Sequence, residues 1–398
     1  MQKIFVAMSG GVDSSVAAAL LKKEGYDVTG VFMKGWSDSR FFKDKTMCPW
    51  VADQEEARKA AAVLGIPFYT WDVQEEYKKK VVDYMVSSYR EGITPNPDVM
   101  CNKEIKFGIF LDRALSMGAD FIATGHYART QLLAGGYSLF AGMDKNKDQS
   151  YFLWTLTQKK LAHVLFPIGG FIKSHVRELA REFGLSNANR KESQGVCFVG
   201  ELEVFDFLKS QIAAQPGPVL TAAGKQVGKH QGAVFYTIGQ RHGIGSPGGG
   251  TAYYVAQKDL AHNTLYVAEN IKEGDLYKTE LIARGVSWIS GTAPQFPLRC
   301  EARIRYRQPL QKCFVDAALH VIFDEPQRAV TPGQSIVFYD GNPRTQRAEQ
   351  SSYDGNPRTQ RAEQSSYDGN PRTQRAEQSS YDDDAVLGGG VIVHDESH

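Results

Sequence analysis

The segment SGGVDSS, residues 9–15, has the composition of a phosphate-binding turn and lies directly after the first apolar run of the chain. A helical pattern opens at Val16. A Gly-rich turn between a strand and a helix points backbone N–H groups and the positive helix end at an anion. The segment has neither the Lys of a Walker loop nor the spacing of a dinucleotide fold. A capped tight turn has a similar composition, but Gly-Gly permits close backbone approach and the hydroxyls add donors, so we favour a phosphate site.

Cys101 and Cys197 are the residues whose surroundings favour sulfur chemistry. Cys101 ends the stretch TPNPDVMC, where two prolines predict an extended lead-in to a helix that starts at Lys103. The dipole of that helix would stabilise a thiolate, and Asp98 could act as acid or base. A single Cys is more often a small buried residue, but two in loop-like contexts beside a phosphate loop favour a sulfur reaction. The other three cysteines are interpreted as structural: Cys48, Cys300 and Cys313.

The first half of the chain alternates between strand and helix patterns. The predicted strands are 3–8, 28–33, 67–73 and 119–124, and the predicted helices are 14–24, 52–64, 75–89, 103–117, 174–183 and 201–212. This order predicts an α/β fold with a doubly wound parallel sheet, helices on both faces and ligands at the carboxyl ends of the strands. Short Gly-rich β segments follow, and alternation over 280–286 and 299–306 predicts a β-barrel or sandwich. We therefore expect a catalytic domain at 1–212, a small connector at 213–276 and a barrel domain at 277–398.

The unit YDGNPRTQRAEQSS occurs three times without change, at 339–352, 353–366 and 367–380. It lacks the apolar face that a stacking repeat needs, and its composition is that of a polar, loosely turned segment. Strand-like residues flank it, so we interpret it as an insertion at a hairpin tip, where extra length costs little. Because residues 339–398 hold 6 Arg against 11 Asp or Glu, the first 338 residues carry 40 Lys or Arg against 34 acidic groups. The near-neutral total thus conceals a basic body.

Composition sets broad limits on the class of protein. The 398 residues are 42% hydrophobic and 23% charged, which indicates a globular protein of two or three domains rather than a disordered or fibrous one. No long apolar run suggests a signal peptide or membrane span, and we expect a cytoplasmic protein. Five cysteines without a CxxC pair fit neither a disulfide framework nor a four-ligand zinc site, so no protein-bound metal is expected.

The phosphate loop resembles the pyrophosphatase-type loop of enzymes that split ATP into AMP and pyrophosphate. Further segments resemble the tRNA-specific 2-thiouridylases, the family that puts sulfur on C2 of the wobble uridine. These segments are AMSGGVDSS, GVFMKGW, TPNPDVMCNKEIKF, ATGHYAR, KDQSYFL, SQGVCFVG, YTIGQRHGIG, RYRQ and TPGQSIVFYDG. The resemblance covers the chain from end to end except for the repeat.

The resemblance implies a role for each matching residue. ATP adenylates the uracil O2, Cys197 carries the persulfide, Cys101 completes the transfer or instead frees hydrosulfide, and Asp98 moves protons. The residues expected at the ATP site are Ala7, Met8, Ser9, Gly10, Gly11, Val12, Asp13, Ser14, Met33 and Gly125. The residues expected to contact tRNA are Asn96, Pro97, Asp98, His126, Lys147, Asp148, Gln149, Arg305, Tyr306 and Gln334. The resemblance also implies Mg²⁺ with the ATP, a persulfide-donating protein as partner and a monomeric enzyme.

Two other functions remain open from the residues alone. An amidating synthetase with the same loop would need an ammonia source but no pair of redox thiols. A non-catalytic tRNA-binding protein would have a degenerate nucleotide site and release no pyrophosphate. The Arg residues at 303, 305 and 307 alternate along a predicted strand, where an exposed solvated face is as plausible as an RNA contact. His126 by itself fits packing as well as a site.

Overall fold

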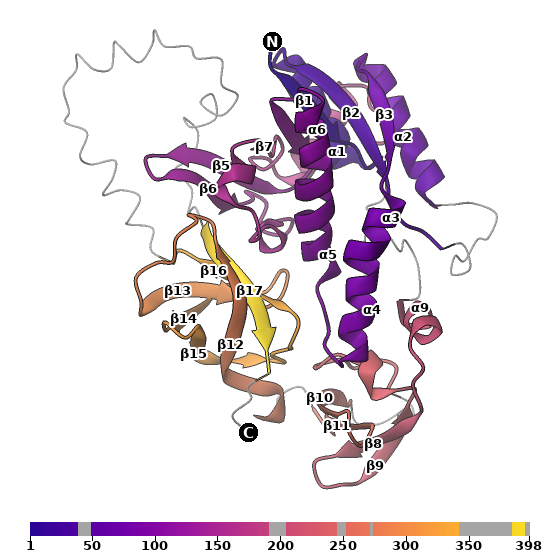
Figure 1. Ribbon diagram of the computed structural model, residues 1–398, viewed down its shortest axis with the longest axis vertical. Coiled ribbons are helices and arrows are strands. Elements are labelled where there is room, and N and C mark those ends of the chain that lie inside the picture. Colours follow the sequence, from indigo (N-terminus) through magenta and orange to yellow (C-terminus); the bar gives the residue numbers. More distant parts are fainter. Residues whose placement is uncertain (39–48, 191–203, 245–251, 271–273, 342–383, 395–398) are drawn as a thin grey trace.

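A five-stranded parallel sheet forms the N-terminal part of the molecule (Figure 1). The structure is a computed structural model, and it describes residues 1–38, 49–190, 204–244, 252–270, 274–341 and 384–394. The strands lie in the order β3-β2-β1-β4-β7, so the chain winds outward from β1 in both directions. Their bounds are β1 Lys3–Ala7, β2 Asp27–Lys34, β3 Phe68–Asp72, β4 Phe121–Thr124 and β7 Val164–Leu165. The predicted doubly wound α/β fold is confirmed, although the two-residue strand β7 was not expected.

Alternate residues of each strand pack against helices on opposite faces of this sheet. Ile4 and Val6 of β1 share one core with the helices α1 (Val12–Lys23), α2 (Pro49–Leu64) and α8 (Lys173–Glu182). Phe5, between them, belongs to a second core with Phe107 and Phe110 on the opposite face. This period of two is the strand signal of the sequence, and burial on both faces explains why β1 is apolar throughout.

The helix that carries Cys101 begins earlier than predicted. It consists of α5 (Pro97–Met100), a π-helical segment (Cys101–Phe110) and α6 (Leu111–Ser116), which run on without a break. Asn96 caps it, since its side-chain oxygen accepts a hydrogen bond from the N–H of Val99 at 3.2 Å, and Pro97 occupies the first helical position. The predicted start at Lys103 is therefore wrong, and Cys101 lies in the second turn. We call residues 97–116 the Cys101 helix.

Two further helical stretches agree with the sequence pattern. The predicted helix 75–89 is observed as α3 (Gln74–Tyr77), a π-helical segment (Lys78–Val82) and α4 (Asp83–Arg90). Helix α9 (Val204–Gln211) lies within the predicted helix 201–212, whereas the short helix α7 (Gln158–Leu161) was not predicted. These two complete the set of α-helices in the described parts of the chain. None of the helices described there has the length and apolarity needed to cross a membrane.

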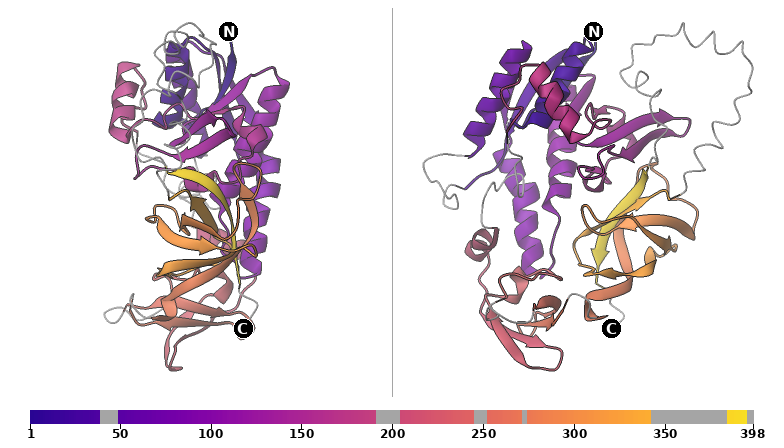
Figure 2. Two further views of the ribbon diagram at one scale, coloured as in Figure 1. Left: turned by 90° about the vertical axis from the view of Figure 1, so that its left-hand side faces the viewer. Right: turned by 180° about the vertical axis from the view of Figure 1, so that it is seen from behind.

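A small four-stranded sheet follows and lies at the end of the molecule opposite the N-terminus (Figure 2). Its strands are ordered β10-β11-β8-β9. They span β8 Gly217–Thr221, β9 Gln226–His230, β10 Tyr254–Asp259 and β11 Thr264–Ala268. Its strands all lie within the predicted connector.

The C-terminal strands close into a six-stranded antiparallel barrel in the order β12-β15-β14-β13-β16-β17, and β12 also pairs with β17. The strands are β12 Tyr277–Trp288, β13 Leu298–Arg303, β14 Gln311–Val315, β15 His320–Arg328, β16 Ser335–Tyr339 and β17 Ala385–Val393. A hairpin from the first half of the chain, β5 (Ala128–Leu133) and β6 (Gly136–Ala141), extends the barrel sheet by pairing with β17. The barrel is therefore joined to the N-terminal half of the chain through backbone hydrogen bonds.

The strands that flank the repeat pair with each other as predicted. Val337 of β16 lies opposite Gly389 of β17, and the N–H of Asp340 donates to the carbonyl of Ala385 at 2.8 Å. This bond lies at the end of the pairing between β16 and β17, next to the insertion. Residues 342–383 lie outside the described residues.

Deleting residues 339–380 should leave both the fold and the activity intact. The deletion joins Phe338 to Tyr381, so the sequence Phe-Tyr-Asp at the end of β16 is restored and Tyr381 replaces Tyr339. The deletion removes Tyr339, which pairs with Val386, and Asp340, whose N–H donates to Ala385, but Tyr381 and Asp382 supply the same residue types at these places. We therefore expect the melting temperature, and the thiolation rate that the resemblance implies, to stay within experimental error of the wild type. Insoluble protein, or a markedly lower melting temperature, would show that the repeat supports the barrel.

Candidate active site

Three residues expected at the ATP site lie at the carboxyl ends of neighbouring strands. Ala7 is the last residue of β1 and pairs with Thr124, which directly precedes Gly125. Met33 lies next to the last residue of β2. The ends of β1, β2 and β4 therefore meet at one edge of the sheet, where ligands of doubly wound folds bind.

The phosphate loop has a backbone shape that depends on Gly10. This residue has a φ of +79°, and a Cβ there would lie 2.2 Å from the carbonyl oxygen of Asp53. Helix α1 begins two residues later, so the N–H groups of its first turn have no partner inside the helix. Contrary to the expectation that the hydroxyls face the phosphate, those of Ser14 and Ser15 donate to the carbonyl of Gly11, at 3.1 and 3.2 Å. The anion site thus consists mainly of backbone N–H groups.

Two residues that follow α8 hold this loop in place. The side-chain amide of Asn187 donates to the carbonyl of Gly10 at 3.0 Å and to the hydroxyl of Ser15 at 2.9 Å. Arg190 donates to the same Gly10 carbonyl at 3.1 Å and to the carboxylate of Asp53 at 2.5 Å. Neither residue was predicted, because each acts on a loop about 180 positions earlier in the chain.

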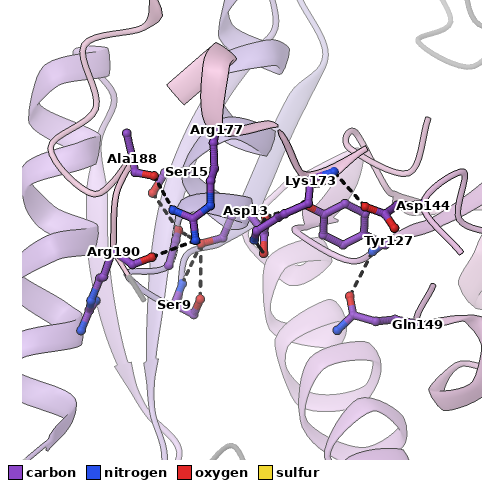
Figure 3. A network of polar contacts seen from close by, with 12 residues as sticks. Ser9, Asp13, Ser15, Tyr127, Asp144, Gln149, Lys173, Arg177, Ala188 and Arg190 are labelled. Carbon is purple, nitrogen blue, oxygen red and sulfur yellow. Dashed lines mark hydrogen bonds and ion pairs between the residues drawn. The ribbon is translucent and has the colours of Figure 1, made fainter. Parts of the chain in front are cut away.

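Asp13, at the start of α1, is held by two groups from elsewhere in the chain (Figure 3). Lys173 lies 2.7 and 2.8 Å from its two carboxylate oxygens, and the hydroxyl of Tyr127 donates to it at 2.8 Å. Lys173 is the first residue of α8, and its backbone N–H donates to the carboxylate of Asp144 at 2.9 Å. Asp144 thus satisfies a backbone donor at the start of this helix. Lys173 was also missed at the level of sequence.

Cys101 is 4% exposed and lies in a core that includes Tyr77. Burial raises the pKa of its thiol, and the negative charge of Asp98 adds to this. The positive charge of Lys106 and a hydrogen bond with Tyr77 lower the pKa. Burial therefore opposes the expected stabilisation of a thiolate at this helix, so a reaction of Cys101 as a nucleophile requires a base, and Asp98 lies one helical turn before it.

His126 lies between the phosphate loop and the Cys101 helix. Its ring is 6% exposed, shares a hydrogen bond of 2.7 Å with the hydroxyl of Thr124, and lies 5.7 Å from the ring of Phe107. Burial, followed by the charge of Lys106, lowers its pKa well below the usual range. A buried neutral imidazole at this position packs the site rather than offering an open stacking face.

Lowering the pH should destabilise the protein through His126. The unfolded chain binds a proton on this residue below about pH 6.5, whereas the folded state does so only at much lower pH. Stability should therefore fall with decreasing pH, by up to about 1.4 kcal/mol per pH unit. Urea unfolding between about pH 7 and about pH 5 measures this, and His126→Asn should show a smaller loss. An unchanged slope in His126→Asn would contradict the assignment.

Gln334 is placed beneath the lead-in to the Cys101 helix. Its side-chain amide donates to the carbonyls of Thr94 and Pro95, at 3.0 and 2.9 Å. The N–H of Thr94 donates to the carbonyl of Pro332 at 3.2 Å. The barrel thus holds the segment that precedes Asn96, Pro97 and Asp98.

The 147–149 loop is built around a buried ion pair. Asp148 is 2% exposed; one of its oxygens accepts from the N–H groups of Gly142 and Ser150, both at 3.0 Å, and the other from Arg303 at 3.1 Å. Gln149 accepts from the N–H of Tyr127 at 3.0 Å. Asp148 therefore shapes the loop from within and does not face outward, while Lys147 lies partly exposed beside it.

The arginines at 303, 305 and 307 do not alternate along one strand, which corrects the sequence prediction. β13 ends at Arg303, whose guanidinium packs over the ring of Tyr339. Arg305 donates to the carbonyl of Ala329 at 2.6 Å, and Arg307 has a φ of +62° in the turn that follows. Tyr306 lies against Phe152, with ring centroids 4.6 Å apart. An exposed arginine face is thus absent from this described segment.

The structure brings together the phosphate loop, Met33, Gly125, His126 and the Cys101 helix. It connects Gln334 to this group through residues 94 and 95. Arg305 and Tyr306 follow β13 of the barrel, where Arg305 donates to the carbonyl of Ile238 in the connector and Tyr306 packs against Phe152. Cys197 lies outside the described residues, as does Cys48. The described cysteines, Cys101, Cys300 and Cys313, are free thiols.

Three family models match successive parts of the chain. They are described as tRNA methyl transferase HUP domain for residues 2–201, tRNA methyl transferase PRC-barrel domain for 205–269 and aminomethyltransferase beta-barrel domain for 278–343. A solved 4-thiouridine synthetase in complex with RNA and ATP is 19% identical, with a TM-score of 0.30, over 53% of this chain and 50% of that one. This last likeness is too low to bear on function.

Curated relatives match over nearly their whole length. The tRNA-specific 2-thiouridylase MnmA of Geobacillus thermodenitrificans is 48% identical over 85% of this chain and 92% of that protein. The protein of the same name from Bacillus thuringiensis is 46% identical over the same shares. With identity at this level across the phosphate loop, the connector and the barrel, the chain belongs to the family of the tRNA-specific 2-thiouridylases.

Proposed function

We propose that this protein replaces O2 of the wobble uridine of tRNA with sulfur at the expense of ATP. The observation that carries the proposal is the near-full-length identity to curated 2-thiouridylases. As a member of that family the protein is a tRNA-modifying sulfurtransferase. The proposal further includes ATP as the activating substrate, a persulfide-donating protein as partner and a monomeric cytoplasmic enzyme. We also retain the domain boundaries 1–212, 213–276 and 277–398.

The arrangement of the site supports a two-stage reaction. Gly125 abuts the start of α1, since a Cβ on it would lie 2.6 Å from the nitrogen of Ser14. The next residue, His126, packs on Phe107 of the Cys101 helix. The positive charge of Lys106 acts on both His126 and Cys101. A nucleotide on the phosphate loop and the thiol therefore belong to one continuous site.

In the first stage the uracil O2 attacks the α-phosphorus of ATP. The new bond joins O2 to phosphorus, the α–β anhydride bond breaks, and pyrophosphate leaves. The first-turn N–H groups of α1 hold phosphate oxygens as the negative charge moves to the leaving group. The uracil base must leave the anticodon stack to reach the nucleotide site, and Asn96 and Pro97 are proposed to contact the flipped base.

In the second stage the terminal sulfur of a Cys197 persulfide attacks C2 and expels AMP. The Cys101 thiolate then attacks the Cys197 sulfur, which releases 2-thiouridine and leaves a Cys101–Cys197 disulfide for a reductant to reopen. In the alternative route Cys101 attacks first and frees hydrosulfide, which attacks C2. Both routes need the Cys101 proton removed, and Asp98 is proposed to accept it.

Mg²⁺ is proposed to arrive with the nucleotide. No group of three or more His, Cys, Asp or Glu residues that could hold a metal occurs among the described residues. This fits an ion that keeps its waters and is held by phosphate oxygens with one or two carboxylates. Asp13 is the acidic side chain of the phosphate loop and the residue placed to contribute one. Bound there, Mg²⁺ would offset the charge of the triphosphate.

Mass analysis of nucleosides from digested tRNA tests the function. After incubation with ATP, Mg²⁺ and a sulfur donor, the wobble uridine should exchange oxygen for sulfur. A methyl gain would instead favour the activity named in the family-model descriptions. Incorporation of ammonia without sulfur would favour an amidating synthetase, and pyrophosphate release that does not depend on tRNA would argue against adenylation of uracil.

A further inference from the structure

The four residues between the end of α4 and the cap of the Cys101 helix are held from two sides of the molecule. We call residues 92–95 the lead-in segment. On the barrel side, Gln334 donates to two of its carbonyls. A Cβ on Gly333 would lie 2.6 Å from the carbonyl oxygen of Thr94, so the barrel also packs directly against this backbone. The lead-in segment ends immediately before Asn96, and its position therefore sets that of the first turn of the Cys101 helix.

The connector holds the same segment from the other side through Lys258 of β10. The ammonium of Lys258 donates to the carbonyls of Gly92 and Tyr236, the second at 2.8 Å. Gly92 follows the last turn of α4 with a φ of +70°, and a Cβ on it would overlap the side chain of Leu260. The end of α4 thus lies against the connector (Figure 1).

The charge of Lys258 makes this contact sensitive to displacement of the lead-in segment. Burial lowers its pKa to about 8, so the ammonium stays mostly charged at neutral pH. Among the described residues no carboxylate forms an ion pair with it; it lies instead at the carboxyl end of α4, where the helix dipole favours a cation. If the carbonyl of Gly92 moved away, a partly buried charge would lose a hydrogen bond, which is unfavourable.

Thr237 gives a second, independent contact between the connector and this region. Its hydroxyl lies 3.2 Å from that of Thr94 and is hydrogen-bonded to the hydroxyl of Tyr89 in α4. The next residue, Ile238, accepts a hydrogen bond from Arg305 of the barrel at 3.3 Å. Connector, barrel and lead-in segment therefore meet at one junction, and the connector is more than a spacer between two domains.

We propose that Lys258 is a positioning residue for thiolation, which fixes the lead-in segment and through it Asn96, Pro97 and Asp98. The proposal rests on the proposed function, in which these three residues contact the flipped base and move protons. A shift of reacting groups by about 1 Å can cost about a hundredfold in rate. Because the affinity for tRNA depends mainly on contacts to phosphates, the loss should appear in kcat rather than in KM.

Thiolation of tRNA by the full-length protein, with kcat and KM for tRNA measured separately, tests the proposal. Lys258→Met keeps the apolar stem but removes the donors, and it should lower kcat about ten- to a hundredfold. The KM for tRNA and the affinity for ATP should stay near their wild-type values. Thr237→Val keeps the shape of the side chain and removes its hydroxyl; it should lower kcat less, by about three- to tenfold.

Two variants of the connector serve as controls for a general loss of stability. Val219→Ala opens a cavity in β8, which β11 separates from β10. Thr264→Val removes a buried hydroxyl that donates to the carbonyl of His262 at 3.1 Å, within the connector. Neither change touches the lead-in segment, so both variants should keep the wild-type kcat even where the melting temperature falls.

The outcomes separate this inference from the function. Selective loss of kcat in Lys258→Met and Thr237→Val supports it. Wild-type kcat in Lys258→Met, a rise in KM alone, or an equal loss of kcat in Val219→Ala would show that Lys258 does not position the site. If Lys258→Met fails to fold, Thr237→Val decides, and an unchanged kcat there contradicts the inference. A wild-type protein that does not thiolate tRNA would instead contradict the proposed function itself.

Discussion

Cys101→Ser should abolish sulfur transfer while the protein continues to release pyrophosphate with ATP and tRNA. The hydroxyl fits the buried site but is a far weaker nucleophile than a thiolate, so thiolation should fall on the order of a thousandfold or more. Adenylation needs the phosphate loop and the uracil but no thiol, so a single turnover of pyrophosphate should remain. Nucleoside mass analysis and a pyrophosphate assay on the same samples measure the two stages separately.

A matched control for this experiment is Cys300→Ser. Cys300 is also 4% exposed and lies in the barrel core opposite Cys313, with the two sulfurs 3.7 Å apart. Both substitutions place a hydroxyl in a buried position, so their effects on folding should be similar, and Cys300→Ser should thiolate tRNA normally. If Cys101→Ser keeps full thiolation, or if it loses pyrophosphate release as severely as thiolation, the proposed role of Cys101 is wrong.

The elements that the sequence predicted well are those whose signal is local. Residues 4–6 of β1 alternate between two cores, and the Gly-Gly turn follows directly, so periodicity and turn chemistry were enough. The predicted start of the Cys101 helix was wrong for an equally local reason. Asn96 and Pro97 form an N-cap and a first helical position, whereas the two prolines had been interpreted as an extended lead-in.

The remainder of the site depends on contacts between distant segments. Lys173 reaches Asp13 across 160 positions, and Arg303 reaches Asp148 across 155. The hydrophobic periodicity of a sequence does not indicate such pairs. The barrel closes through β12 and β17, and this pairing places strand residues on either side of the repeat in one sheet. A single sequence can indicate that charged residues exist in these segments, but it cannot indicate that they are buried against each other.

Gly125→Ala should disable the nucleotide site although alanine is the smallest possible change. The added Cβ would lie 2.6 Å from the nitrogen of Ser14 and 2.7 Å from the carbonyl carbon of Asp13. Both are backbone atoms of the first turn of α1, so no side chain can rotate away, and either α1 or the end of β4 must move. Overpacking of this kind costs roughly 1–3 kcal/mol, and a shift of reacting groups by about 1 Å can cost about a hundredfold in rate.

The expected result is a protein with a slightly lower melting temperature, weak ATP binding and thiolation reduced about a hundredfold. Gly135→Ala is the control, since a Cβ at that turn between β5 and β6 meets nothing within 4 Å. It should match the wild type in all three measurements. Because the contact of Gly125 is with the same N–H groups that are proposed to hold phosphate, normal ATP affinity in Gly125→Ala would mean that the phosphates lie elsewhere. The adenylation site would then have to be sought away from the start of α1.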